Sequence, residues 1–390
     1  MRWSSAISRH PNTDLALEEA ITQARSGLGD GAVDWVLCFF SPEHAPAAGE
    51  VAKHLAGQFP AAVVSGCSAR SCIGDGVEVE EGPSLSLTLA SLPGVVLHPF
   101  HASADDLAMG VDPIAHWRRV SGVEPDEQPA FVLLGDPWSG DVEAVIRGFD
   151  AAYPGAVLVG GLASGGQQPG EDVLLHGDGA LSSGLVGVAL TGDVVVEAIV
   201  AQGCRPIGQP MFVTRSDQNW IFEVDGRPPF EVLNELAEQA SERELQLFQT
   251  SLFVGIQMDP DQMELGRGDF LVRNVLGGDP DSGALAVGAT VEDTMVVQFQ
   301  LRDGETAAED LDARLRGHAN EGATGALLFS CLGRGRGMYG SSNHDSDALR
   351  RHLGDVSVSG FFCNGEIGPV QGQTFLHGYT SAFGVFRPKH

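Results

Sequence analysis

The chain has 390 residues, enough for two or three domains with sizeable hydrophobic cores. With 43% hydrophobic and 19% charged residues, its composition is that of a globular protein and not of a disordered chain. The 52 acidic residues against 23 basic ones give a formal net charge of −29. A strongly negative field repels phosphate groups, and we therefore expect no nucleic-acid partner.

Apolar runs and amphipathic stretches predict a repeated arrangement of elements. After an amphipathic helix at residues 14–27, the pattern predicts a strand, a helix and two strands at residues 35–40, 46–58, 61–65 and 84–92. The same order recurs at residues 131–134, 141–153, 156–159 and 185–190, and again at residues 326–331, 345–353, 356–359 and 382–386. We interpret this recurrence as a repeated β-α-β-β module.

A turn of small residues follows the second strand of each module. The turns are Gly66-Cys67-Ser68, residues 160–164 and residues 360–368. Because open α/β sheets bind ligands at the carboxyl ends of their strands, these turns are the first candidates for a binding cleft.

From residue 208 onward a different run of strands and helices interrupts the repeat, with a boundary near residues 203–210. The predicted fold class is therefore α/β. We expect repeated β-α-β-β modules that form mixed sheets covered by helices, in a two-domain arrangement.

The six cysteines form no repeated C-x-x-C pairs, so we expect reduced thiols and neither a disulfide framework nor a zinc site. Residues 1–13 hold no apolar signal-peptide core, and no uncharged apolar run is long enough to cross a bilayer. We therefore expect a cytoplasmic protein without membrane insertion, metal or other cofactor.

Several motifs resemble those of the FIST sensory domains. The amino-terminal half carries Val64-Ser-Gly-Cys-Ser68 and residues 82–87, 158–164 and 200–208. The carboxyl-terminal half carries residues 270–274, Ser330-Cys-Leu-Gly-Arg-Gly335, residues 360–369 and Phe375-Leu-His-Gly-Tyr-Thr380. The most specific part of the resemblance is the pair formed by Gly365-Glu-Ile-Gly-Pro369 and Leu376-His-Gly-Tyr-Thr380.

The resemblance implies a FIST N-like region at residues 1–205 and a FIST C-like region at residues 206–390. It also implies a standalone sensory protein of intracellular signal transduction. Such a protein would bind a small polar metabolite, such as an amino acid, and act through a separate signalling protein.

Two charged residues of the third module are the leading ligand-binding candidates. Arg334 could hold the carboxylate of an amino acid in a bidentate fork, and Glu366 could hold its ammonium group. The other expected ligand-binding residues are Asn364, Gly365, Cys331, Tyr339, His377, Tyr379, Thr380, Cys67, Ser68 and Ser164. The structural alternative is that Arg334 and Glu366 pair with each other or with the backbone.

A cysteine-dependent enzyme is one alternative to a sensor. Cys67, Cys331 or Cys363 could act as a nucleophile if His377 served as its base. A free cysteine is more often a small buried apolar residue, and we assign no catalytic residue.

A nucleotide-binding protein is the other alternative. Gly335-Arg-Gly-Met-Tyr-Gly340 matches G-x-G-x-x-G, and Asp355 lies about 20 residues on, as in a dinucleotide site. Residues 341–344 separate these glycines from the next expected helix, which argues against a pyrophosphate at the start of that helix.

Overall fold

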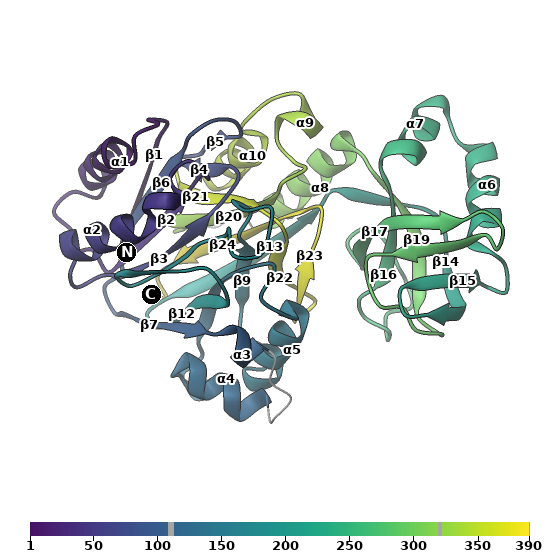
Figure 1. Cartoon of the computed structure of the whole chain (residues 1–390), viewed down its shortest axis with the longest axis horizontal. Coiled ribbons are helices and arrows are strands. Elements are labelled where there is room, and N and C mark those ends of the chain that lie inside the picture. The colour runs from purple at the N-terminus through teal and green to yellow at the C-terminus, as the bar shows by residue number, and fades with distance from the viewer. Residues whose placement is uncertain (108–112, 319–321, 390) are drawn as a thin grey trace. The chain divides into compact units, whose positions relative to one another are not determined.

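The computed structural model describes residues 1–107, 113–318 and 322–389, and the chain divides into two compact units (Figure 1). We call the first the three-module unit; it comprises Met1–Val200, Asp312–Leu376 and Thr380–His390. We call the second the barrel unit; it comprises Ala201–Leu311 and His377–Tyr379. The third predicted module therefore shares a compact unit with the first two, although the barrel unit separates them in the sequence.

Three modules with one order of elements make up most of the chain. The first consists of β1 (Arg2–Ser8), α1 (Thr13–Leu28), β2 (Trp35–Phe40), η1 (Ala45–Ala47), α2 (Ala48–Gln58), β3 (Val63–Ser68), β4 (Cys72–Gly74), β5 (Val77–Val79) and β6 (Leu85–Ser91). The second consists of β7 (Val95–Ala102), α3 (Ala104–Leu107), α4 (Pro113–Ser121), η2 (Pro125–Glu127), β8 (Ala130–Gly135), α5 (Val142–Ala152), β9 (Leu158–Leu162), β10 (Leu174–His176), β11 (Gly179–Leu181) and β12 (Leu185–Gly192). The third consists of β13 (Val195–Gln202), α8 (Gly304–Gly317), β20 (Gly325–Cys331), α9 (Arg336–Tyr339), α10 (His344–Leu353), β21 (Ser357–Cys363), β22 (Glu366–Val370), β23 (Gln373–His377) and β24 (Thr380–Arg387). The boundary between the two units falls within three of these elements, because residues 201–202 of β13, residues 304–311 of α8 and His377 of β23 belong to the barrel unit.

Each module is thus longer than the predicted β-α-β-β unit. An additional strand and helix precede the predicted elements, and a short hairpin is added before the last strand. The α/β class, the mixed sheets and the two-domain arrangement are confirmed.

The described strands of the three modules form three six-stranded sheets with equivalent strand orders: β1-β6-β2-β3-β10-β11, β7-β12-β8-β9-β22-β23 and β13-β24-β20-β21-β4-β5. In each sheet the two strands connected by a helix are parallel, as β-α-β connections require. The short hairpins are exchanged between modules, since β4 pairs with β21, β10 with β3 and β22 with β9. The hairpin exchange ties all three modules into one cyclic arrangement.

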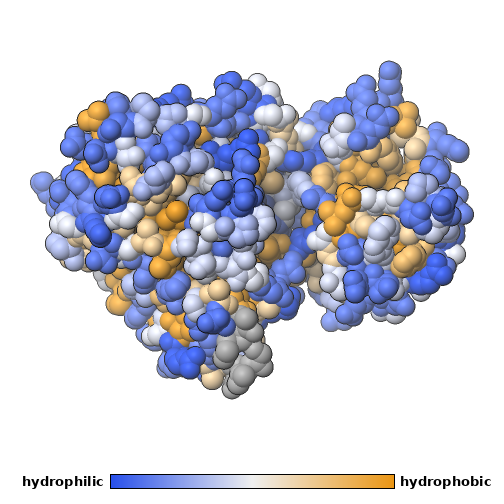
Figure 2. Space-filling model, in the orientation of Figure 1, coloured by the Kyte–Doolittle hydropathy of each residue, from blue (hydrophilic) through white to orange (hydrophobic). Residues whose placement is uncertain are grey.

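The sheets enclose an apolar core, and helices α1 and α2, α4 and α5, and α10 lie on separate outer sides (Figure 1). Strand β2 is buried along its whole length because one face packs on helices and the other faces this core. Rings from different modules meet there: Phe39 lies 4.9 Å from Phe361, and Trp3 lies 4.7 Å from Phe386, between ring centroids. Figure 2 shows hydrophilic residues over most of the visible surface of the three-module unit, consistent with the acidic composition.

One glycine occurs at the same place in each parallel strand pair. Gly66, Gly160 and Gly360 lie opposite Cys38, Leu133 and Leu328 in the neighbouring strand. A Cβ atom added at these glycines would lie 1.8, 1.9 and 1.8 Å from the carbonyl oxygen of the opposite residue. The close backbone approach that only glycine permits is therefore a shared feature of the three modules.

The barrel unit contains a closed barrel formed by its described strands. In barrel order they are β14 (Cys204–Asp217), β15 (Trp220–Val224), β18 (Ala284–Val287), β17 (Phe270–Asp279), β16 (Leu252–Gln257) and β19 (Val296–Arg302), and helices α6 (Pro229–Gln239) and α7 (Glu242–Thr250) also belong to this unit. Apolar side chains such as Val254 and Phe299 fill the interior. The space left among them is about 10 Å³, no larger than one water molecule, so the barrel interior is a packed core.

Across residues 1–107, 113–318 and 322–389, each helix is too short or too polar to span a membrane.

Candidate functional site

The predicted strand-end turns of the three modules meet inside the three-module unit. The Ser164 amide donates to the Ser68 carbonyl at 3.3 Å, and the Ser164 hydroxyl donates to the carbonyl of Phe362. The Asn364 side-chain amide donates to the Ala163 carbonyl at 3.1 Å. The repeat therefore correctly places these turns together, and the polar groups that point between them bind one another.

Three more of the predicted ligand-binding residues pack inside these turns. The hydroxyl of Ser68, which is fully buried, donates to Asp172 at 3.0 Å. The Gly365 carbonyl accepts the Leu162 amide at 2.9 Å. Burial strongly raises the pKa of the Cys67 thiol, and Asp172 raises it further, so this thiol stays protonated.

Burial also strongly raises the pKa of the Cys363 thiol, with Glu366 adding to the effect. Because the thiolate is the nucleophile, burial argues against catalysis by Cys67 or Cys363. Cys331, at the end of β20, is half-buried.

Arg334 is held by a carboxylate of the protein itself. Its Nε donates to Asp345 Oδ2 at 2.8 Å and its Nη2 donates to Asp345 Oδ1 at 3.2 Å. Both side chains are buried, and the Arg334 guanidinium carbon lies 5.5 Å from the centroid of the Tyr339 ring. The fork expected to hold a ligand carboxylate is therefore filled by Asp345.

Glu366 also binds within the protein. Its Oε2 accepts the Thr380 amide at 3.1 Å and the Thr380 hydroxyl at 2.8 Å, and the side chain is fully buried. Glu366 thus makes the kind of backbone contact that the structural alternative anticipates, whereas the observed partner of Arg334 is the Asp345 side chain, which that alternative did not name. Neither residue lines either of the two cavities of about 420 Å³ described below.

The last two predicted ligand-binding residues, His377 and Tyr379, belong to the barrel unit. His377 is buried. The Tyr379 ring lies 4.2 Å from the Phe253 ring, between centroids, and 5.1 Å from the guanidinium carbon of Arg302.

A charged cavity of about 420 Å³ lies beside the Arg334 loop in the three-module unit. Its lining residues are Arg9, Glu78, Val79, Glu80, Glu81, Arg336, Gly337 and Ser342, and we call it the acidic pocket. The exchanged β4–β5 hairpin supplies or immediately precedes the three glutamates, and its pairing with β21 brings them to the loop that follows β20. The pocket therefore exists only because modules one and three share a sheet.

Glu78 connects the acidic pocket to the buried polar groups around Arg334. The amide and hydroxyl of Ser346 both donate to Glu78 Oε1 at 2.8 Å, and Ser346 directly follows Asp345 in α10. Burial, with a further contribution from the Asp345 charge, raises the pKa of Glu78 from its ordinary value of 4.5 to about 7. A proton on Glu78 is therefore held in the folded protein near neutral pH.

The raised pKa of Glu78 predicts how stability depends on pH. The folded protein binds this proton between about pH 4.5 and 7, where the unfolded chain has lost it, so stability falls as pH rises through that window. The slope from one such group is at most about 1.4 kcal/mol per pH unit. In melting temperatures measured across this range, Glu78→Gln should flatten the slope and Glu81→Gln, at an exposed carboxylate, should not. An unchanged slope in Glu78→Gln contradicts the assignment.

Glu80 occupies the position that a nucleotide phosphate would take at the glycine-rich loop. Both Glu80 carboxylate oxygens accept the backbone amide of Arg336, at 3.0 and 2.8 Å. A Cβ at Gly335 would lie 2.6 Å from Glu80 Oε2, so the first glycine of the motif makes room for a carboxylate. Helix α9 has four residues and its first amide already binds an anion, so the dinucleotide interpretation of residues 335–340 is not supported.

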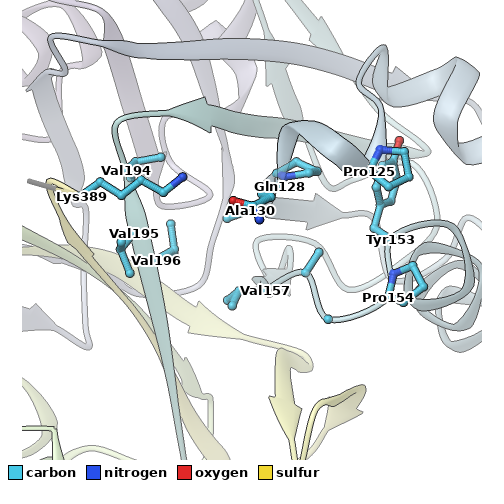
Figure 3. Close-up of a pocket in the computed structure, with 13 residues that line it drawn as sticks. Pro125, Gln128, Ala130, Tyr153, Pro154, Val157, Val194, Val195, Val196 and Lys389 are labelled. Atoms are coloured by element: carbon cyan, nitrogen blue, oxygen red, sulfur yellow. The ribbon is translucent and has the colours of Figure 1, made fainter.

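A second cavity, also of about 420 Å³, lies beside the starts of β8 and β9 of the second module and of β13 of the third (Figure 3). Val194, Val195 and Val196 lie on one side of it, and Tyr153 and Pro154 on the other. The Tyr153 hydroxyl is already bonded to Ser121 and to the Val123 carbonyl at 2.8 Å. Lys389 is the one charged side chain among its lining residues, so the cavity offers an ammonium group but no carboxylate and is the weaker candidate for a zwitterion.

Sequence reasoning missed Arg9, Glu78, Glu80 and Glu81. The run Val77-Glu-Val-Glu-Glu81 does alternate as a strand would, which is a signal for β5, but it reads as an ordinary exposed acidic strand. The placement of the three glutamates depends on which sheet the hairpin joins, and periodicity carries no information on strand pairing.

Comparison with known proteins places these features in a family. Residues 34–227 match the FIST N domain and residues 229–369 match the FIST C domain. The chain is 36% identical over 389 residues to an uncharacterized protein of Mycobacterium tuberculosis strain H37Rv, covering 99% of this chain and 100% of that protein. It is 35% identical over 393 residues to an uncharacterized protein of Mycobacterium bovis, covering 99% of each. Cyanuric acid hydrolase from A. caulinodans aligns over 99% of both chains with a TM-score of 0.35 and 10% identity.

Proposed function

The chain belongs to the FIST family, whose domains are associated with sensory signal transduction, and we propose that it senses a small zwitterion of the amino-acid class. The acidic pocket is the proposed binding site. The signal would pass to a separate partner protein.

The single observation that carries the proposal is the combination of charges around one cavity. Glu80 and Glu81 offer carboxylates for an ammonium group, and Arg9 and Arg336 offer guanidinium groups for a carboxylate. A cavity of about 420 Å³ suits a small metabolite, because ligand sites in proteins commonly have volumes of roughly 300–1,000 Å³. The resemblance-based expectation of an amino-acid ligand is thereby kept, with Arg336 and Glu80 in the roles first given to Arg334 and Glu366.

The connections of the pocket suit a sensor. Its lining comes from three separated stretches of chain: the residue after β1, the exchanged hairpin, and the loop between β20 and α10. A zwitterion bound to all three would favour the conformation in which they are close together, and the Glu78 to Ser346 contacts link that conformation to α10. Ligand binding would in this way change the population of a state that a partner recognises.

A thermal-shift screen against the twenty amino acids tests the proposal. A ligand at 100 times its dissociation constant adds about 2.7 kcal/mol of stability, which is several degrees of melting temperature for a unit of this size. We expect a shift with one amino-acid class. Arg336→Gln and Glu80→Gln should each reduce it strongly, because each removes one charge complementary to the zwitterion.

Arg147→Gln is the matched control. Arg147 lies on α5 with its side chain 61% exposed and outside the acidic pocket, so the ligand-dependent shift should be that of the wild type. A shift that persists in both pocket variants, or no shift with any amino acid, would argue against this binding site.

A further inference from the structure

Strand β19 of the barrel unit carries two polar residues with buried side-chain donors that make no hydrogen bond among the described residues. Gln300 and Arg302 are two positions apart, so they point to the same face of the strand. The side chains of Val297, Phe299 and Leu301 point to the other face. Val297 and Phe299 belong to the barrel core. Gln300 and Arg302 therefore project from the outer face of the barrel.

Within the described chain, the Nε and Nη2 atoms of Arg302 and the Nε2 atom of Gln300 are buried and make no hydrogen bond. A buried donor without an acceptor is destabilising, more so when it is charged, and native proteins rarely tolerate one without cause. Three such donors on one strand face indicate a binding site for an anionic or strongly accepting group from outside the described chain.

The two side-chain atoms that make no hydrogen bond in Arg302, Nε and Nη2, bind carboxylates in two other arginines of the described chain. Arg334 uses its Nε and Nη2 to hold Asp345, and Arg387 uses the same two atoms to hold Glu197 at 3.0 and 2.8 Å. The planar fork formed by these atoms matches the two oxygens of a carboxylate. Arg302 thus presents the same fork without a carboxylate of the described chain to fill it.

Two aromatic rings lie beside these donors. The guanidinium carbon of Arg302 lies 5.1 Å from the centroid of the Tyr379 ring, which in turn lies 4.2 Å from the Phe253 ring centroid. Phe253 pairs with Gln300 across the β16–β19 ladder, so it shares the face of Gln300 and Arg302. Tyr379 has a φ of 67°, an uncommon conformation for a bulky residue that sets its ring in this position.

We infer that the outer face of β19 binds a small carboxylate with a flat apolar body. The carboxylate lies in the fork of Arg302 and accepts a further hydrogen bond from the Gln300 amide, and the flat body packs on the rings of Tyr379 and Phe253. The site uses residues of the barrel unit alone, so it does not rest on the acidic pocket. Tyr379 comes from the Leu-His-Gly-Tyr-Thr motif, to which the proposed function gives no role.

Benzoate is the probe for this site, with benzamide as its uncharged counterpart of similar shape. In titration calorimetry with the full chain we expect saturable binding of benzoate at millimolar concentrations or below, and at least about tenfold weaker binding of benzamide. Arg302→Lys keeps the charge but removes the planar fork, and it should weaken benzoate binding about tenfold or more.

Arg215→Gln is the matched control, since Arg215 also lies over a ring of the barrel unit, Phe222, but its carboxylate partner is Glu223. It should bind benzoate as the wild type does, as should Arg336→Gln of the acidic pocket. The comparison of benzoate with benzamide on the wild-type protein needs no variant to fold. Equal binding of the two, no saturable benzoate binding, tighter binding of inorganic phosphate than of benzoate, or full affinity in Arg302→Lys would each overturn the inference.

Discussion

Replacing Asp345 with asparagine is expected to lower the free energy of unfolding by about 3–5 kcal/mol. The substitution keeps the shape of the side chain but removes the charge that holds Arg334, and both side chains are buried, at 2% exposure or less. A buried guanidinium without a carboxylate is costly, because water cannot solvate it. Urea unfolding followed by circular dichroism measures the loss.

The Asp345 carboxylate also determines how the stability of the protein changes at low pH. Burial raises the pKa of Asp345, but the Arg334 charge and the hydrogen bonds from neighbours outweigh burial and hold the pKa well below its ordinary value. Because the folded-state pKa is depressed, the stabilisation is present above the unfolded-state pKa and is lost as pH falls through lower values. Asp345→Asn should therefore lose less stability on acidification than the wild type.

The control for Asp345 is the same substitution at an exposed ion pair. Asp75 contacts Arg350 at 3.2 Å with 70% of its own side chain exposed, so Asp75→Asn should cost no more than about 0.5 kcal/mol. Replacing both members of the buried pair, as Arg334→Met with Asp345→Leu, should recover part of the loss, because no unpaired charge is left. An Asp345→Asn protein as stable as Asp75→Asn would contradict the role given to this ion pair.

The sequence carries enough information to identify the modules and to place their turns. Buried strands such as residues 35–40 and 326–331 are continuous apolar runs, and small residues follow the second strand in each repeat. These are local patterns, and the hydrophobic effect acts on them in the same way in each module. Consequently the expectation that Ser68, Ser164 and the residues near Cys363 lie together could be drawn from the sequence alone.

Strand exchange between modules could not be predicted in this way. The β4–β5 hairpin has no special pattern, yet its pairing with β21 brings Glu78 next to Ser346, which lies 268 positions later in the chain. A hairpin can add to any free strand edge, and the choice depends on the packing of the complete sheet. The acidic pocket depends on this choice and so could not be found from residue spacing.

The partner of the buried Arg334 charge could not be predicted from the sequence either. The Ser330-Cys-Leu-Gly-Arg334 segment indicates an arginine on a loop after a buried strand, which fits both a ligand site and an ion pair. The residue that fills the fork is Asp345, eleven positions later, in the first turn of α10. An aspartate in the first turn of a helix is common for helix stability alone, so nothing in the sequence marks it as the partner of Arg334.

Gly160→Ala is expected to lower the free energy of unfolding by more than about 3 kcal/mol, or to prevent accumulation of folded protein. The added methyl group would lie 1.9 Å from the Leu133 carbonyl oxygen. That oxygen belongs to the backbone of β8, which is paired with β9 in parallel register, so it cannot move away without disrupting the sheet. Urea unfolding and the yield of soluble protein measure the effect.

Gly57→Ala provides the matched control for this substitution. Gly57 lies in α2, and beyond its chain neighbours and the helix backbone a Cβ there would have no atom within 4 Å. Alanine is the better helix former, so this variant should be neutral or more stable by up to about 1 kcal/mol. Gly66→Ala and Gly360→Ala should behave like Gly160→Ala, because each would place its Cβ 1.8 Å from the carbonyl of the opposite strand. If any of the three were tolerated as well as Gly57→Ala, the close backbone approach would not be a requirement common to the three modules.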